Sequence, residues 1–186
     1  MPQPSKNTAV ISPCGRYRYR LDRHIGDAGP VIAFMLHNPS TADGDRDDPT
    51  SRRGIGFAKQ WGASHMVFVN PFAGRATEPK DLWRMNDPVG PLNMQYIVNL
   101  AVAVAASDGW FVFAWGAINP PAALRDRVRE HLWDVEDSVR AYCRDIRCLG
   151  LTKSADPRHP LYLPADTPLQ KWGCSVPQDS APHPFV

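Results

Sequence analysis

The sequence predicts a three-layer α/β/α fold around a central, mainly parallel four-stranded sheet, with an N-terminal edge strand or hairpin. Four apolar runs carry this prediction, and each stops abruptly at a polar turn, as buried parallel strands do. Helical patterns separate the runs, and strands that alternate with helices indicate a parallel sheet covered on both faces. The runs occupy about residues 31–37, 65–70, 110–115 and 146–150.

The remaining elements follow from local patterns. Residues 14–21 alternate Arg with Tyr or Leu, which predicts a half-exposed strand that flanks the sheet as an edge. Residues 71–90 are proline-rich and indicate a long loop with one helical turn. We expect a single domain over 1–186 with its core in about 13–172, a loose leader over 1–12 and a tail over 173–186. Helices are expected at about residues 51–61, 91–106 and 120–142.

Composition describes an ordinary globular protein. The chain has 186 residues, of which 43% are hydrophobic, and a net charge of +2, which does not suit a protein that coats nucleic acid. The four cysteines form no CxxC pair, and no stretch is apolar enough to span a bilayer. We therefore expect a cytoplasmic protein without a membrane partner, a structural metal or a disulfide framework.

Three polar residues follow strands of the predicted sheet. Asn38 and Asn70 each precede a proline just after an apolar run, and His159 follows the last run in a proline-rich loop. Ligands of open α/β sheets bind beyond the carboxyl ends of the strands, so these side chains are expected on one rim. An Asn at such a turn also has a structural interpretation as an Asx-turn.

An acidic loop follows the first of these turns. Asp43, Asp45, Asp47 and Asp48 could bind a divalent cation, although Gly54 occupies the position where an EF-hand needs Glu. Alternatively, these residues cap the next helix or pair with Arg52 and Arg53. Downstream, Phe57 follows Gly54 and Gly56, which allow close backbone approach, and its ring is a candidate to stack on a flat base. No GxGxxG, P-loop, GxSxG or HExxH motif occurs, and we expect no cofactor.

Several motifs occur in order and resemble a bacterial and phage family known only as a domain of unknown function. The resemblance covers about residues 15–172 and is specific, but it supplies no activity. The motifs are Asn38-Pro-Ser-Thr-Ala-Asp43, Asp47-Asp-Pro-Thr-Ser-Arg-Arg53, Asn70-Pro-Phe-Ala-Gly-Arg-Ala-Thr77, Asp87-Pro-Val-Gly-Pro91, Ala114-Trp-Gly116 and Arg158-His-Pro-Leu-Tyr-Leu163.

Five features also resemble, more distantly, the uracil-DNA glycosylase superfamily. Asn38-Pro39 is similar to that superfamily's water-activating turn, and Phe57 to its base-stacking aromatic residue. Asn70 ends a strand similar to the one that carries the base-reading Asn, and residues 111–116 resemble a further strand. His159-Pro160 is similar to the start of the loop whose His stabilises the departing base.

The chain departs from that superfamily at two of these motifs. Asn38 stands where the classical branch has Asp, so water activation would need another group, such as Asp43 or Asp48. Leu161-Tyr162 replaces Ser-Pro in the last motif, so either residue is a candidate for the side chain that enters the duplex.

The resemblance implies a uracil-DNA glycosylase-like fold and a hydrolase that flips a modified or mismatched base, expected to be a pyrimidine, out of DNA and excises it. Two alternatives stay open: a nucleoside or nucleotide hydrolase, and a non-catalytic nucleic-acid-binding module. Protein partners are not predicted. The expected catalytic residues are Asn38, His159, Asp43 and Asp48, and the expected substrate-binding residues are Pro39, Ser40, Phe57, Asn70, Arg52, Arg53 and Tyr162.

Overall fold

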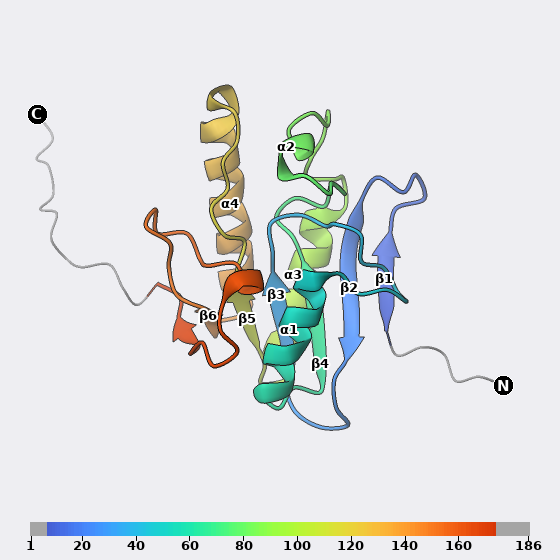
Figure 1. The fold of residues 1–186 in the computed structure, drawn as a ribbon, viewed down its shortest axis with the longest axis vertical. Helices are drawn as coiled ribbons and strands as arrows, with labels where there is room; N and C mark the ends of the chain where they lie inside the picture. The colour runs from blue at the N-terminus through green and yellow to red at the C-terminus, as the bar shows by residue number, and fades with distance from the viewer. Residues whose placement is uncertain (1–6, 174–186) are drawn as a thin grey trace, which may run out of the picture.

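The computed structural model describes residues 7–173, and its strands form one mixed sheet in the order β1-β2-β4-β3-β5-β6-β7 (Figure 1). Neighbouring strands among β4, β3, β5 and β6 are parallel, whereas β1/β2, β2/β4 and β6/β7 are antiparallel. The strands are β1 (Thr8–Ile11), β2 (Arg18–His24), β3 (Val31–Met35), β4 (His65–Val69), β5 (Trp110–Phe113), β6 (Ile146–Cys148) and β7 (Gln170–Lys171).

The prediction of a four-stranded sheet is wrong in number, because the described residues form seven strands. The four predicted strands are the parallel centre of the sheet. The additional β1 and β7 are short and carry no fully buried residue, so they lack the apolar run that marks a central strand. Residues 8–11 belong to β1 rather than to a loose leader, and the expected tail lies outside the described residues except for Gly173.

Helices lie against both faces of the sheet. The alternation of β3 directs Phe34 toward α1 and Met35 toward α3 and α4. On the first face Phe57 of α1 packs with Phe34 and Phe68, and on the second face Leu100 and Val139 pack with Met35. The helices are α1 (Pro49–Gln60), α2 (Pro79–Leu82), α3 (Asn93–Ala105) and α4 (Arg125–Arg140), with single 3-10 turns at Ala122–Leu124 and Pro160–Tyr162.

Strands β1 and β2 form an antiparallel N-terminal hairpin, which is the second of the two predicted alternatives. Strand β2 is therefore not itself the edge, because β1 covers it on one side and β4 on the other. Its arginines are also more buried than a half-exposed strand suggests, since Arg18 is 4% exposed and Arg23 is 2% exposed. The loop between β3 and α1 covers them, and both guanidinium groups donate hydrogen bonds to its backbone carbonyls. This loop lies at the edge where the parallel strands end, on the upper side of the sheet in Figure 1.

No helix of the described residues is both long enough and apolar enough to cross a membrane.

Candidate functional site

A small polar cavity of about 40 Å³ lies at the carboxyl edge of the parallel strands. Five segments meet there: β2, the loop after β3, the first turn of α1, β4 and the loop after β6. The cavity brings together four of the predicted residues from distant parts of the chain. Its lining consists of Arg18, Leu21, Leu36, Asn38, Ser40, Asp48, Thr50, Ser51, Phe68 and His159.

The side chain of Asn38 is held by two backbone carbonyls. Its Nδ2 donates to the oxygen of Pro39 at 3.0 Å and to the oxygen of Ala76 at 2.8 Å. Only the amide nitrogen can donate to a carbonyl, so these contacts fix which way the amide is turned. The Oδ1 atom then has no hydrogen-bond partner among residues 7–173. An oriented acceptor of this kind can position a water molecule or a ligand N–H group.

Asp48 is the N-cap residue of α1. Its Oδ1 accepts a hydrogen bond from the backbone N–H of Ser51 at 2.7 Å, which satisfies one of the free donors of the first helical turn. The cap places a carboxylate in the lining of the cavity and leaves Oδ2 as an acceptor. A carboxylate at this position can accept a proton from water or stabilise a nearby positive charge.

His159 faces the cavity as a neutral imidazole. Burial lowers the pKa of His159 to about 4, against the opposing effect of the Asp48 carboxylate. Its Nδ1 accepts a hydrogen bond from the N–H of Leu161 at 3.3 Å, so the proton of the neutral ring resides on Nε2. The ring therefore offers one hydrogen-bond donor at neutral pH. Gly116 allows its approach, because a Cβ there would meet Cβ of His159 at 3.1 Å.

Arg18 contributes a buried cation to the same cavity. Burial lowers the pKa of Arg18 to about 10, so the guanidinium stays charged at neutral pH. Its Nη1 donates to the oxygen of Ala42 at 2.7 Å. The cavity thus combines a cation, a carboxylate, an oriented amide and a neutral imidazole, with Leu36 and Phe68 among its apolar walls.

A comparison with protein-family models matches residues 18–161 to a family described as a protein of unknown function, DUF1643. The chain belongs to this family. The matched segment contains every residue that lines the cavity. No curated protein and no solved structure matches the chain.

Two predicted base-binding residues of this DUF1643 protein lie outside the cavity lining. Phe57 is 2% exposed and stacks on Trp61 at 5.3 Å between ring centroids, so the structure corrects its expected place on the rim. Gly54, one turn earlier in the helix, serves the packing of α1 on the sheet, because a Cβ there would meet Cζ of Phe68 at 2.7 Å. Asn70 is 1% exposed, and its backbone oxygen accepts a hydrogen bond from Asn93 Nδ2 at 2.8 Å. Its own Nδ2 is buried without a partner among the described residues.

The acidic loop owes its shape mainly to the arginines of β2. Asp47 pairs with Arg23 at 2.8 Å rather than with the side chain of Arg52, which donates to its backbone oxygen. Asp43 accepts the N–H groups of residues 45 and 46 in an Asx-turn, and these hydrogen bonds lower its pKa. Within residues 7–173, no three His, Cys, Asp or Glu side chains gather as a metal site. The loop is therefore a structural feature that positions Asp48.

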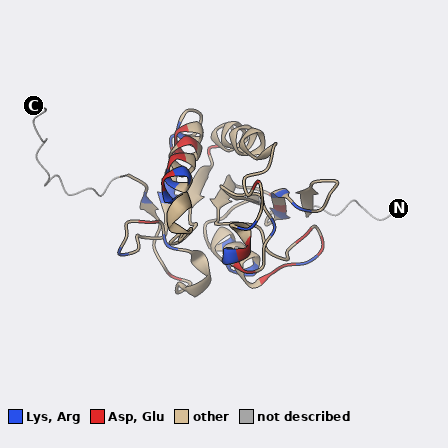
Figure 2. Ribbon diagram, turned by 90° about the horizontal axis from the view of Figure 1, so that it is seen from above, with Lys and Arg blue, Asp and Glu red and all other residues tan. Residues whose placement is uncertain are grey.

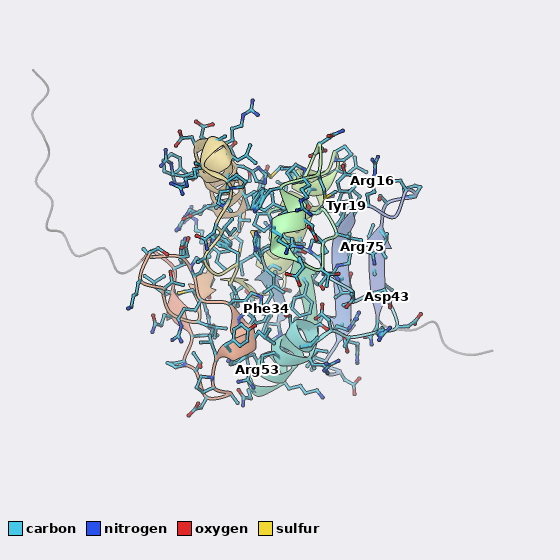
Figure 3. All side chains as sticks on the ribbon, turned by 45° about the horizontal axis from the view of Figure 1, so that its top comes forward. Arg16, Tyr19, Phe34, Asp43, Arg53 and Arg75 are labelled. Carbon is cyan, nitrogen blue, oxygen red and sulfur yellow. The ribbon has the colours of Figure 1, made fainter. Side chains whose placement is uncertain are left out.

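Arg53, Pro39 and Tyr162, which were also predicted to bind substrate, are not in the lining of the cavity. Arg53 lies over the ring of Phe57 at 5.3 Å, and Figure 3 shows Arg53 and Asp43 on opposite sides of α1. Pro39 is buried and supplies the oxygen that accepts from Asn38. Tyr162 is 86% exposed on the 3-10 turn that follows His159, so its ring is free to contact a partner.

Three polar residues of the lining were not among the predicted site residues: Arg18, Thr50 and Ser51. Arg18 was expected on a half-exposed strand, and its burial depends on the loop that folds over it. Thr50 and Ser51 enter the cavity because they form the first turn behind the Asp48 cap, a role that the motif Asp-Pro-Thr-Ser could have indicated. His37, which precedes Asn38, does not line the cavity, but its Nε2 is buried without a partner among the described residues, and burial lowers its pKa to about 4.

Proposed function

We propose that this DUF1643 protein is an N-glycosidase that removes a modified or mismatched base from DNA. The observation that carries this proposal is the convergence of Asn38, Asp48 and His159 on one cavity at the carboxyl edge of parallel strands. These residues come from three separate segments. Asn38 and His159 belong to two of the five features whose order resembles that of the uracil-DNA glycosylase superfamily, whereas the loop that carries Asp48 has no counterpart in that resemblance.

Each of the three side chains suits one requirement of this reaction. Hydrolysis of an N-glycosidic bond passes through an oxocarbenium-like sugar while negative charge develops on the departing base. Asp48, through its free oxygen, would accept the proton of the attacking water and stabilise the sugar cation. Asn38 Oδ1 would hold that water, and the Nε2–H of His159 would donate to the departing base.

The size of the cavity sets a condition on this proposal. About 40 Å³ is room for roughly three water molecules and not for a whole base, since one water needs about 10–15 Å³. The base must therefore dock at the mouth of the cavity with only its reacting edge inside. The exposed Tyr162, on the 3-10 turn that follows His159, would be the aromatic side chain that stacks on the base or enters the duplex.

A base-release assay tests this proposal. Single- and double-stranded oligonucleotides that carry uracil, 5-hydroxymethyluracil or a thymine mismatch are incubated with the protein, and alkali then cuts any abasic site. We expect strand cleavage with wild type and a loss of about 10²-fold or more with Asn38→Ala and with His159→Ala. Folded wild-type protein that cleaves none of these substrates would contradict the proposal.

A free nucleotide is the second candidate substrate, and the buried Arg18 favours it because a guanidinium suits a phosphate group. Salt separates the two candidates. Binding of a duplex weakens steeply as salt rises because counterions are released from DNA, whereas binding of a nucleotide depends on salt much less.

A further inference from the structure

The guanidinium of Arg18 is the least compensated charge of the cavity. Within the described part of the chain, no carboxylate lies within 4.0 Å of it, and the hydrogen bond that its side chain makes goes to the backbone oxygen of Ala42. Removal of a charged group from water is costly unless the charge is paired. The 4% exposed Arg18 therefore lines a cavity in which a counter-charge would be stabilising.

The carboxylates near Arg18 are engaged elsewhere. Asp47 binds Nε of Arg23 at 2.8 Å, and Asp43 accepts two backbone N–H groups of its own loop. Asp48 lines the same cavity, but its Oδ1 is bound to the N–H of Ser51. Arg75 and Arg23 are close enough to disfavour the charge of Arg18 further. The positive charge of Arg18 is thus balanced by Asp48 and Asp43 at longer range and not by a direct ion pair.

The surrounding groups add donors that suit an oxyanion. Helix α1 is 12 residues long, and its N-terminus carries partial positive charge. Pro49 has no N–H and Ser51 is bound to the cap, which leaves the N–H of Thr50 as a first-turn donor without a partner in residues 7–173. The hydroxyl groups of Ser40 and Thr50 also belong to residues of the lining.

We propose that Arg18 and the first turn of α1 form a subsite for a compact oxyanion, either a phosphate group or a carboxylate. The volume of about 40 Å³ suits a group of this size. A guanidinium binds both anions through paired N–H donors, so the chemistry is shared. The proposal of this subsite depends on the residues of the cavity and does not require that the protein cleaves a glycosidic bond. If the proposed function also holds, the bound anion is a group of the substrate.

Direct titration of the full-length protein tests the subsite. Inorganic phosphate and acetate are added in separate arms at constant ionic strength with sodium chloride, and the Nε–H resonance of Arg18 is followed by NMR together with the melting temperature. We expect a saturable shift of this resonance and a rise in melting temperature in at least one arm. The arm with the tighter binding identifies the anion as a phosphate or a carboxylate.

Variants assign the effect to Arg18. Arg18→Met should abolish saturable binding, and Arg18→Lys should weaken it by at least about tenfold, because the ammonium lacks the paired donors. The matched control is Arg20→Met on the same strand, whose side chain pairs with Asp22 and should leave binding unchanged. If Arg18→Met does not fold, the shift of the Arg18 resonance in wild type and the affinity of the Arg18→Lys variant test the assignment instead.

Two outcomes would overturn the subsite: no saturable shift of the Arg18 resonance in wild type with either anion, or equal binding by folded Arg18→Met. Base release is measured separately. Anion binding without base release would contradict the proposed function and leave the subsite standing, whereas base release without anion binding would do the reverse.

Discussion

Asn38 makes two hydrogen bonds that an amide nitrogen can make and a carboxylate cannot. We predict that Asn38→Asp lowers the free energy of unfolding by about 1–3 kcal/mol, because a carboxylate oxygen would face the carbonyl oxygens of Pro39 and Ala76. Urea denaturation measures this change. Asn99→Asp, at a solvent-accessible position of α3, is the matched control and should alter stability by less than about 0.5 kcal/mol. Equal effects of the two substitutions would contradict this account of the turn.

Two buried histidines make stability depend on pH. Burial lowers the pKa values of His37 and His159 to about 4, below the value of about 6.5 in an unfolded chain. Between these values the unfolded chain binds more protons, so we predict that stability is full above about pH 7 and falls as the pH drops from 6.5 toward 4.

Urea denaturation at pH 5.0 and pH 7.5 tests this prediction against the double variant His37→Gln/His159→Gln, in which the loss between the two pH values should shrink. Asp145 does not affect this comparison. Its hydrogen bonds to Arg147 and Lys171 lower its pKa from 3.8 to about 2, so the stability that it contributes is lost only below pH 4. A double variant with the same pH dependence as wild type would show that neither histidine is the cause.

At the scale of elements, the packing of α1 on β4 requires a glycine. A Cβ at Gly54 would meet Cζ of Phe68 at 2.7 Å, whereas a Cβ at Gly56 of the same helix would meet nothing within 4 Å. We predict that Gly54→Ala destabilises the protein by about 1–3 kcal/mol through overpacking, despite the better helix propensity of alanine. Gly56→Ala should stabilise it by up to about 1 kcal/mol. Thermal denaturation of the two variants provides the measurement, and a stabilising Gly54→Ala would contradict the close contact of α1 with the sheet.

The sequence predicted correctly those strands whose own residues are apolar enough to indicate that they are buried. The four parallel strands consist mostly of apolar residues, and the structure confirms them. Strands β1 and β7 were missed because short strands at the edges of the sheet need no apolar run. An aromatic residue that follows two glycines shows the same pattern on a rim or in a core, which is why the expected position of Phe57 was wrong. The burial of Arg18 could not be predicted from its own strand, because a loop about 24 residues further along the chain covers it.

At the scale of the whole molecule, charge is mixed over the surface. Figure 2 shows Lys and Arg interleaved with Asp and Glu along α4, and the net charge is +2. With so small a net charge, we expect modest affinity for a duplex, with contacts concentrated at the carboxyl edge of the sheet. The specificity of this protein must then come from the cavity and its mouth.

The central claim is that the cavity performs chemistry through Asp48, and Asp48→Asn tests it most directly. Asn caps a helix about as well as Asp, so this substitution keeps α1 in place and removes the charge of the carboxylate. The measurement is the rate of base release from the oligonucleotide that wild type cleaves best, with the exposed Asp45→Asn as a control in the same loop. We predict a loss of about 10²–10⁴-fold for Asp48→Asn and no loss for Asp45→Asn. A folded Asp48→Asn variant that releases base at the wild-type rate would contradict the claim.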